Sequence, residues 1–285
     1  MALPPWLRKR FSLSVELDKM ESLFEDLGLH TVCQSAHCPN LGECFKRGTA
    51  TFLILGGVCT RNCRFCAVPK GKPDSLDPEE PEKVAQAAKK LSLRHVVVTS
   101  VTRDDLPDGG AYHFKRTIQA IREVLPFSRV EVLTPDFKGE RESIRVVAEE
   151  KPEVFNHNLE TVPRLYPEVR PGATYSTSLQ LLEWIKADFP QVITKSGLMV
   201  GLGETKEEVI RVLQDLRGVG CDMVTIGQYL RPSGHHLPVS EYLPPPVFAE
   251  YREIGLTLGF KEVASGPFVR SSYLADRSAE KVFSD

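Results

Sequence analysis

The sequence lacks a surplus of charge of either sign. Its 285 residues include 36 Lys and Arg against 38 Asp and Glu, which gives a formal net charge of −2 at pH 7. Proteins whose main partner is nucleic acid carry a basic excess or a basic patch. We therefore expect no nucleic acid among the partners of this chain.

Long apolar runs are also missing. No stretch approaches the roughly 20 apolar residues that cross a bilayer. The first ten residues contain Pro4, Pro5 and Trp6 and lack the apolar segment of a signal peptide. We expect no membrane association and an intracellular location: the cytoplasm or, in a eukaryote, the matrix or stroma of an organelle.

Cysteine is scarce outside one segment. Six of the seven cysteines form two triplets, Cys33, Cys38 and Cys44 spaced C-x4-C-x5-C, then Cys59, Cys63 and Cys66 spaced C-x3-C-x2-C. The odd count and the chain length argue against a disulfide framework, which belongs to small secreted domains. Zinc sites favour paired C-x2-C or C-x2-H elements that complete a tetrahedron, and neither triplet supplies that pairing. The seventh cysteine, Cys221, lies in an apolar stretch and is expected to be a small buried side chain.

Each triplet is one thiolate short of a four-cysteine site. Iron–sulfur clusters normally take one cysteine thiolate per iron. A cluster with three thiolates leaves one iron open to another ligand or a substrate, as in catalytic rather than closed structural metal sites. The spacing therefore indicates iron–sulfur chemistry with an open position.

The rest of the chain alternates between strand-like and helix-like patterns. Six short, β-branched segments predict strands at Thr51 to Leu55, His95 to Thr99, Val130 to Thr134, Val154 to Asn156, Val192 to Val200 and Met223 to Gly227. Amphipathic patterns lie between them, and the clearest, from Thr205 to Leu216, begins with a capping box of Thr205 and Glu208.

Six strand-then-helix units predict an α/β fold with a parallel sheet. A partial (β/α)6 TIM-type barrel fits better than a doubly wound sheet, because no Gly-x-Gly-x-x-Gly fingerprint follows an early strand. We expect a barrel over 49–230, an N-terminal extension over 1–48 and a C-terminal extension over 231–285, the extensions covering the open side of the barrel. The spacing of Val15, Met20, Leu23, Phe24 and Leu27 predicts a helix that packs the first extension onto the barrel.

Polar and glycine-rich groups follow these strands, where a parallel barrel gathers its chemistry. They include Asp108, Gly109 and Gly110 after the second strand, Asn158 and Glu160 after the fourth, and Lys195 in the fifth. Taken singly, the Asp-Gly-Gly run could be an ordinary turn, and Asn158 could cap a helix. Their joint position on one rim favours a ligand-binding role.

The second triplet, with Phe65 before Cys66 directly after a first strand, resembles that of the radical S-adenosylmethionine superfamily. The resemblance implies that Cys59, Cys63 and Cys66 hold a 4Fe-4S cluster whose open iron takes the methionyl group of S-adenosylmethionine. It also implies a 5′-deoxyadenosyl radical that abstracts hydrogen from unactivated carbon.

A narrower resemblance extends from about residue 30 to about residue 275. The first triplet, Asp108-Gly109-Gly110-Ala111 and Val269-Arg270-Ser271-Ser272-Tyr273 resemble motifs of the lipoyl synthase family. The resemblance implies that Cys33, Cys38 and Cys44 hold an auxiliary 4Fe-4S cluster with Ser272 as its fourth ligand, Ser271 being the alternative. A hard alkoxide should hold such a cluster less firmly than a thiolate would.

This resemblance also implies an activity. Two sulfur atoms are inserted at C6 and C8 of an octanoyl-lysine on a lipoyl carrier domain or H protein, and the auxiliary cluster is the sulfur source. Asp108, Gly109, Gly110, Asn158, Glu160 and Lys195 then become candidates for binding S-adenosylmethionine or the carrier peptide. A reductant such as flavodoxin or ferredoxin and an iron–sulfur carrier that rebuilds the cluster are further expected partners.

Three other functions were weighed against this one. Biotin synthase inserts sulfur on the same type of barrel, but the C-x4-C-x5-C triplet before the radical motif argues against it. A methylthiotransferase acting on RNA would need a C-terminal RNA-binding module, and no segment here is long or basic enough. A non-catalytic iron–sulfur carrier poorly explains the open iron and the polar rim.

Overall fold

The computed structural model describes residues 3–8, 15–47 and 49–284, which fall into two compact units. We call Arg10–Arg61 with Ala67–Glu153 the N-half. Met1–Lys9, Asn62–Cys66 and Val154–Asp285 form the C-half.

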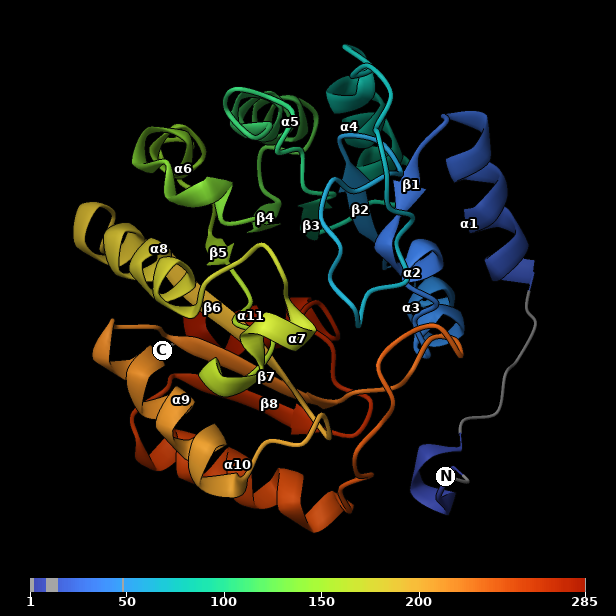
Figure 1. Ribbon diagram of the computed structural model, residues 1–285. Helices are drawn as coiled ribbons and strands as arrows, with labels where there is room; N and C mark the ends of the chain where they lie inside the picture. The colour runs from blue at the N-terminus through green and yellow to red at the C-terminus, as the bar shows by residue number, and fades with distance from the viewer. Residues whose placement is uncertain (1–2, 9–14, 48, 285) are drawn as a thin grey trace. The chain divides into compact units, whose positions relative to one another are not determined.

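The N-half contains four strands in chain order, drawn from blue to green in Figure 1. They are β1 (His30–Thr31), β2 (Thr51–Ile54), β3 (His95–Ser100) and β4 (Arg129–Leu133). The strand β1 pairs antiparallel with β2, whereas β2, β3 and β4 pair in parallel. The helices that follow β2, β3 and β4 are α4 (Glu80–Lys90), α5 (Ala111–Val124) and α6 (Arg141–Ala148), with a short η2 (Phe137–Gly139) before α6.

Sequence accounts directly for these elements. The strand β3 is a β-branched run that is buried along nearly its whole length, as expected of a strand covered on both faces. Phe114, Ile118 and Ile121 form one fully buried stripe on α5, and this stripe is the period-3.6 pattern of a helix packed on a sheet.

The predicted N-terminal helix is present as α1 (Val15–Asp26). It packs in the N-half through Phe24, whose ring centroid lies 5.8 Å from that of Phe45 and 5.9 Å from that of Phe52. Phe52 belongs to β2, and Phe45 to α3 (Leu41–Lys46), which follows the short helix α2 (Val32–Ser35). Three buried aromatic rings therefore fasten this segment to the first parallel strand.

The C-half contains β5 (Val154–Asn156), β6 (Ile193–Val200), β7 (Met223–Gln228) and β8 (Glu262–Gly266), and each pairs in parallel with the next. Its helices are η1 (Pro5–Leu7), η3 (Pro163–Leu165), α7 (Tyr166–Val169), α8 (Tyr175–Asp188), α9 (Lys206–Gly218), α10 (Pro245–Thr257) and α11 (Ala275–Phe283). In Figure 1, α9 and α10 lie side by side along the strands β7 and β8. The predicted capping box of Thr205 and Glu208 opens α9.

The six predicted strands are β2 to β7, each followed by a helix, with bounds within one residue of those expected. The strands β1 and β8 and the helices α10 and α11 were not predicted. The proposed boundaries at 48 and 230 stay predictions, and residue 48 lies outside the described residues. No helix in the described part of the chain is long and apolar enough to cross a membrane.

Candidate iron–sulfur and co-substrate site

The first cysteine triplet lies in the N-half, in the short helices between β1 and β2. Cys33 belongs to α2, Cys44 belongs to α3, and Cys38 lies in the turn between them. The turn is closed by the Cys38 N–H, which donates to the Cys33 carbonyl at 3.0 Å. On the other side, the N–H of Thr49 donates to the Cys44 carbonyl at 2.9 Å. All three cysteines are thus fixed through their own backbone.

Electrostatics shows that the three thiols are neighbours. Burial, with smaller contributions from the nearby Cys38 and Cys44, raises the pKa of the Cys33 thiol from 9.0 to about 12. Cys33 is buried and Cys38 and Cys44 are half-buried, so three thiolates this close together would need a cation among them, and iron supplies one. The donor set therefore fits an iron–sulfur cluster. Among residues 3–8, 15–47 and 49–284, no three His, Cys, Asp or Glu side chains already have the geometry of a metal site.

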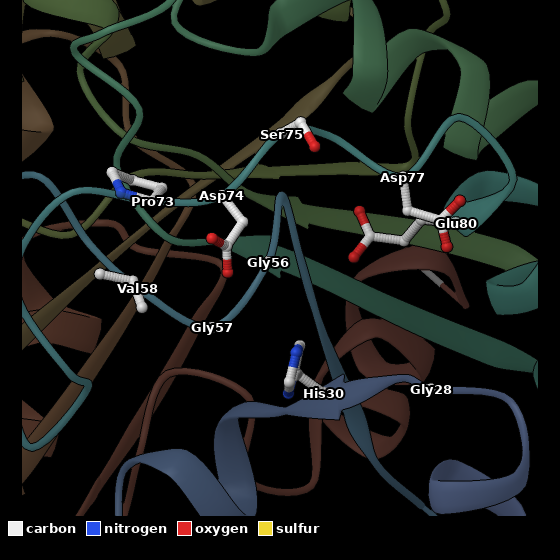
Figure 2. Close-up of a pocket in the computed structure, with 10 residues that line it drawn as sticks. All are labelled: Gly28, His30, Gly56, Gly57, Val58, Pro73, Asp74, Ser75, Asp77 and Glu80. Carbon is white, nitrogen blue, oxygen red and sulfur yellow. The ribbon is translucent and has the colours of Figure 1, made fainter.

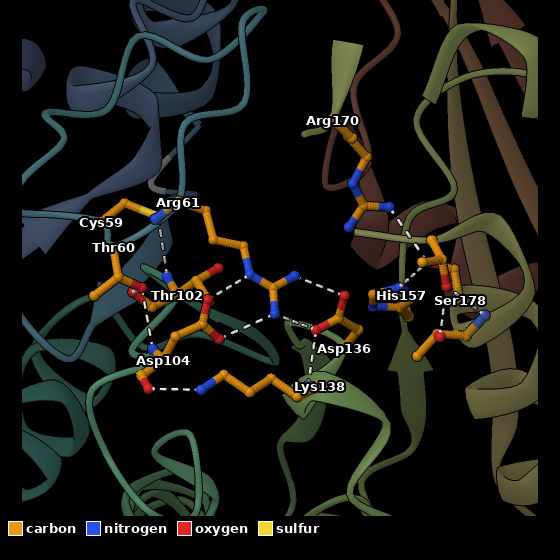
Figure 3. A network of polar contacts seen from close by, with 12 residues as sticks. Cys59, Thr60, Arg61, Thr102, Asp104, Asp136, Lys138, His157, Arg170 and Ser178 are labelled. Carbon is orange, nitrogen blue, oxygen red and sulfur yellow. Dashed lines mark hydrogen bonds and ion pairs between the residues drawn. The ribbon is translucent and has the colours of Figure 1, made fainter. Parts of the chain in front are cut away.

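The second triplet is divided by the two units, because Cys59 belongs to the N-half and Cys63 and Cys66 to the C-half. The Sγ of Cys59 accepts hydrogen bonds from two backbone N–H groups, those of Arg61 and Thr102, each at 3.4 Å. Figure 3 shows these contacts. Hydrogen bonds to sulfur are typical of iron–sulfur ligands and tune the reduction potential of the cluster.

Next to Cys59, the buried Arg61 guanidinium bridges two carboxylates (Figure 3). It donates to Asp104 at 2.7 and 3.0 Å and to Asp136 at 2.6 Å through two nitrogens. Burial alone would lower the pKa of Arg61, but the hydrogen bonds to Asp136 and Asp104 raise it well above its ordinary value. The sequence reasoning did not single out this cluster.

Cys63 and Cys66 are anchored within the C-half. The N–H of Cys66 donates to the Cys63 carbonyl at 3.2 Å, and the ring of His236 lies 3.1 Å from the Cys66 carbonyl oxygen. Between them, the N–H of Arg64 donates to the Val169 carbonyl at the end of α7, at 3.0 Å. The peptide that carries these two thiols is therefore held from two sides.

The Asp108-Gly109-Gly110 run has a clear local role in the N-half. The carboxylate of Asp108 accepts from the N–H groups of Gly110 and Tyr112, both at 2.9 Å, at the start of α5. Gly110 has φ +90°, and a Cβ there would overlap the side chain of Leu55. The turn interpretation thus explains Asp108 and Gly110, and any contact of the run with a ligand stays a prediction.

Asn158 and Glu160 lie together in the C-half and reach the terminal serine motif. The side-chain amide of Asn158 donates to the Glu160 carboxylate at 2.9 Å and to the Ser271 hydroxyl at 3.2 Å. Glu160 has φ +69°, an unusual backbone for a side chain of its size. Burial raises the pKa of Glu160, against the opposing effect of Arg170. The rim residues and the Arg-Ser-Ser-Tyr motif, predicted separately, are therefore in direct contact.

Arg170 links the backbone of Asn158 to the side chain of Ser178. Its guanidinium donates to the Asn158 carbonyl at 2.8 Å and to the Ser178 hydroxyl, which lies 3.0 Å from the His157 ring. The three side chains appear in Figure 3. His157 therefore belongs to the packing of α8 against β5. No local motif in the sequence points to Arg170.

Val269, at the start of the serine motif, packs directly against the backbone of Gly227. A Cβ at Gly227, in β7, would overlap the carbonyl oxygen of Val269. The guanidinium of Arg270 donates to that same carbonyl at 2.7 Å. The serine motif therefore packs against β7. Lys195, a predicted rim residue on β6, is buried and 1% exposed.

A small cavity of about 190 Å³ opens in the N-half beside the residues that lead to Cys59. Figure 2 shows its lining: Gly28, His30, Gly56, Gly57, Val58, Pro73, Asp74, Ser75, Asp77 and Glu80. Two of its acids already have partners, because Asp77 binds Lys83 at 2.6 Å and Glu80 binds His113 at 2.7 Å. The sequence reasoning did not predict this cavity.

Comparison with known proteins defines the class. A model of the radical SAM superfamily matches residues 53–216, more than half of the chain. The solved structure of a methylornithine synthase is similar over 89% of this chain and 79% of its own, with a TM-score of 0.54 at 16% identity. A maturase of the [FeFe]-hydrogenase is similar over 95% of this chain and 75% of its own, with a TM-score of 0.52 at 14% identity. The chain belongs to the radical SAM superfamily, and the predicted partial barrel is confirmed.

Closer relatives identify the branch. A lipoyl synthase from Caldanaerobacter subterraneus subsp. tengcongensis is 63% identical over 96% of this chain and 95% of its own length. Another, from Caldicellulosiruptor saccharolyticus, is 57% identical over 97% of both chains. The chain belongs to the lipoyl synthase family, an enzyme family that uses 4Fe-4S clusters and S-adenosylmethionine. The resemblance inferred from the cysteine spacing is confirmed.

Proposed function

We propose that this chain inserts two sulfur atoms at C6 and C8 of an octanoyl-lysine carried by a lipoyl domain or H protein. The observation that carries the proposal is 63% identity to a lipoyl synthase over almost the whole length of both chains. The two cysteine triplets support it, because each is one thiolate short of a four-cysteine site, and the proposed reaction needs two such clusters, one for the radical and one as the sulfur source.

The proposed ligands divide by site. Cys59, Cys63 and Cys66 hold the cluster that binds S-adenosylmethionine, and when bound this pair supplies the hydrogen-abstracting radical. Cys33, Cys38 and Cys44, with Ser272, hold the cluster that is the sulfur source. The shared electrostatics of the first three thiols and the N–H groups directed at Cys59 support these assignments.

Ser272 remains the proposed fourth ligand, and Ser271 has a separate structural partner. The Ser271 hydroxyl accepts from Asn158 at 3.2 Å, so this side chain already holds the motif in the C-half. Asp108, Gly109, Gly110, Asn158, Glu160 and Lys195 remain proposed contacts to the co-substrate or the carrier peptide. Flavodoxin or ferredoxin as reductant and an iron–sulfur carrier for cluster rebuilding complete the proposed partners, and the proposed location is intracellular.

Anaerobic reconstitution with iron and sulfide tests the proposal. With two 4Fe-4S clusters, about eight irons per chain should bind. Incubation with S-adenosylmethionine, a reductant and an octanoyl-lysyl peptide should then yield 5′-deoxyadenosine and a peptide that gains mass from sulfur. A wild-type chain that binds one cluster, or that transfers no sulfur, would refute the proposal.

Matched cysteine variants separate the two sites. Cys44→Ala should lose about half of the iron and all sulfur insertion but still form 5′-deoxyadenosine, whereas Cys63→Ala should lose 5′-deoxyadenosine itself. Cys221→Ala is the control, because Cys221 is fully buried and its thiol bonds to the Met223 carbonyl at 3.3 Å. It should retain both activities.

A further inference from the structure

Two backbone N–H groups contact the Cys59 sulfur, one from the loop of Cys59 itself and one from the loop after β3. The Arg61 N–H, two residues along, and the Thr102 N–H, from the loop after β3, both donate to Sγ at 3.4 Å. The backbone of Cys59 is itself fixed, because its N–H donates to the Pro69 carbonyl at 2.8 Å and its carbonyl accepts from Gly71 at 3.0 Å. The hydrogen bonds to Sγ therefore depend on where the Arg61 and Thr102 N–H groups lie relative to it.

These peptides are bonded to each other through Thr60. Its N–H and its hydroxyl both donate to the Thr102 carbonyl, at 3.0 and 2.9 Å, and the hydroxyl accepts from the Asp104 N–H at 3.0 Å. Three hydrogen bonds therefore join residues 60–61 to residues 102–104 in one piece. Figure 3 shows this piece beside the Cys59 sulfur.

The Arg61 side chain fastens that piece to a third loop. Its side chain is 7% exposed, and all three guanidinium nitrogens donate to Asp104 or Asp136. Asp136, which follows β4, is 3% exposed and also accepts from the Lys138 N–H at 3.0 Å. The bridge thus spans the loops after β2, β3 and β4 within the N-half.

We propose that Arg61 is a positioning residue for the radical chemistry: its bridge to Asp104 and Asp136 holds two N–H donors on the Cys59 sulfur and thereby sets the reduction potential of the cluster bound there. The inference rests on the proposed ligand role of Cys59. N–H dipoles directed at sulfur stabilise the added negative charge of the reduced cluster, which raises its potential.

The guanidinium group is what the position requires. A planar guanidinium offers five donors in a fixed fork and can bind two carboxylates at once. A lysine at 61 keeps the charge but carries its donors on a single nitrogen, so it cannot reproduce the two paired contacts that the guanidinium makes to Asp104 and Asp136. Arg61→Lys therefore separates the effect of geometry from that of charge.

A potentiometric titration of the reconstituted full-length protein, followed by electron paramagnetic resonance, tests the inference. The signal of interest is the one that S-adenosylmethionine perturbs. Arg61→Lys should shift the midpoint potential of this signal to a lower value. At the wild-type midpoint, the ratio of reduced to oxidised cluster should therefore fall about fivefold, which is the effect of losing one hydrogen bond. Asp104→Asn, which leaves the Asp136 pair intact, should give a smaller shift in the same direction.

Arg116→Lys is the matched control, because Arg116 pairs with Glu82 at 2.6 Å on the surface of the same half. It should leave the midpoint unchanged. An unchanged midpoint in both Arg61→Lys and Asp104→Asn, with the iron content of the wild type, would overturn the inference and leave Arg61 a purely structural staple. A wild-type protein without a signal that responds to S-adenosylmethionine would instead refute the proposed function.

Discussion

The carboxylate of Glu80 accepts a hydrogen bond from the backbone N–H of Leu55 at 2.7 Å. The same oxygen lies 2.7 Å from the His113 ring, and the Leu55 carbonyl accepts from the buried Arg103 guanidinium at 3.1 Å. Leu55 has φ +69°, a strained backbone for a branched side chain, at the point where β2 enters the loop of the second triplet. Two buried charged groups therefore hold the entrance of that loop in an unfavourable conformation.

Glu80→Gln should destabilise the protein by about 1–3 kcal/mol, since a neutral amide oxygen replaces the charged oxygen that contacts both the Leu55 N–H and the His113 ring. Urea unfolding of the metal-free chain measures this. Glu82→Gln, at an exposed ion pair on the same helix, is the control and should cost about 0.5 kcal/mol or less. Equal effects of the two substitutions would show that the bond to Leu55 adds no stability.

Gly110→Ala should be more destabilising than an alanine at another glycine with a similar backbone. Gly110 and Gly172 have φ +90° and +88°, but only at Gly110 would a Cβ meet another side chain, that of Leu55. We expect about 1–2 kcal/mol for Gly172→Ala from backbone strain alone. Overlap should add about 1–3 kcal/mol for Gly110→Ala. Thermal unfolding of the pair isolates the packing contribution, which is zero if the two variants melt alike.

Acid should weaken the start of α9. The guanidinium of Arg164 binds the Glu208 carboxylate at 2.8 and 2.9 Å, and together with the Thr205 N–H it lowers the pKa of Glu208 from 4.5 to about 2. Because folding lowers this pKa, the ionised carboxylate stabilises the folded protein fully above about pH 4.5. This stabilisation is lost as the pH falls toward about 2.

Glu208→Gln should remove that part of the pH dependence and cost roughly 0.5–1 kcal/mol at neutral pH, after allowance for solvent screening. The free energy of unfolding, measured between pH 7 and pH 3, checks this. Arg164→Gln should cost less in the Glu208→Gln background than in the wild type, because both remove the same ion pair, although Arg164 also donates to the Gly203 carbonyl. Fully additive losses would contradict a direct interaction.

The two neighbouring serines should respond differently to substitution. Ser272→Ala should abolish sulfur insertion, and Ser272→Cys should retain the auxiliary cluster but slow sulfur release, because a thiolate holds iron more firmly than an alkoxide. Ser271→Ala should cost about 1 kcal/mol through the lost bond to Asn158 and retain insertion. Insertion, measured by peptide mass, should therefore distinguish the two. Loss of insertion in Ser271→Ala alone would exchange their assignments.

The parallel strands were predictable because their sequences are short β-branched runs, and the period of α9 with its capping box was equally clear. The strand β1 has two residues and β8 ends in Ala264, Ser265 and Gly266, so neither carries a strand pattern of its own. Their existence depends on pairing with β2 and β7. Such tertiary effects are invisible in a local window.

The two cysteine triplets could be recognised from the sequence because spacing along the chain is itself the signal, and their role as cluster ligands stays a prediction. The Arg61 bridge could not be recognised in this way, because Arg61, Asp104 and Asp136 come from three loops and only the fold brings them together. The Asp-Gly-Gly run shows the opposite difficulty. Helix capping and close packing on Leu55 call for the same residues that a ligand-binding turn would.

The contact of Gly227 with the Val269 carbonyl has a consequence for biosynthesis. The first triplet leaves the ribosome early, and the residues around it can fold within the N-half. The surface of β7 on which the serine motif packs forms only after β7 and β8 have been synthesised and have paired. A nascent chain therefore contains the three thiols of the first triplet well before its proposed serine ligand, Ser272, has been made, so during synthesis those thiols meet metal, oxidant or chaperone without it.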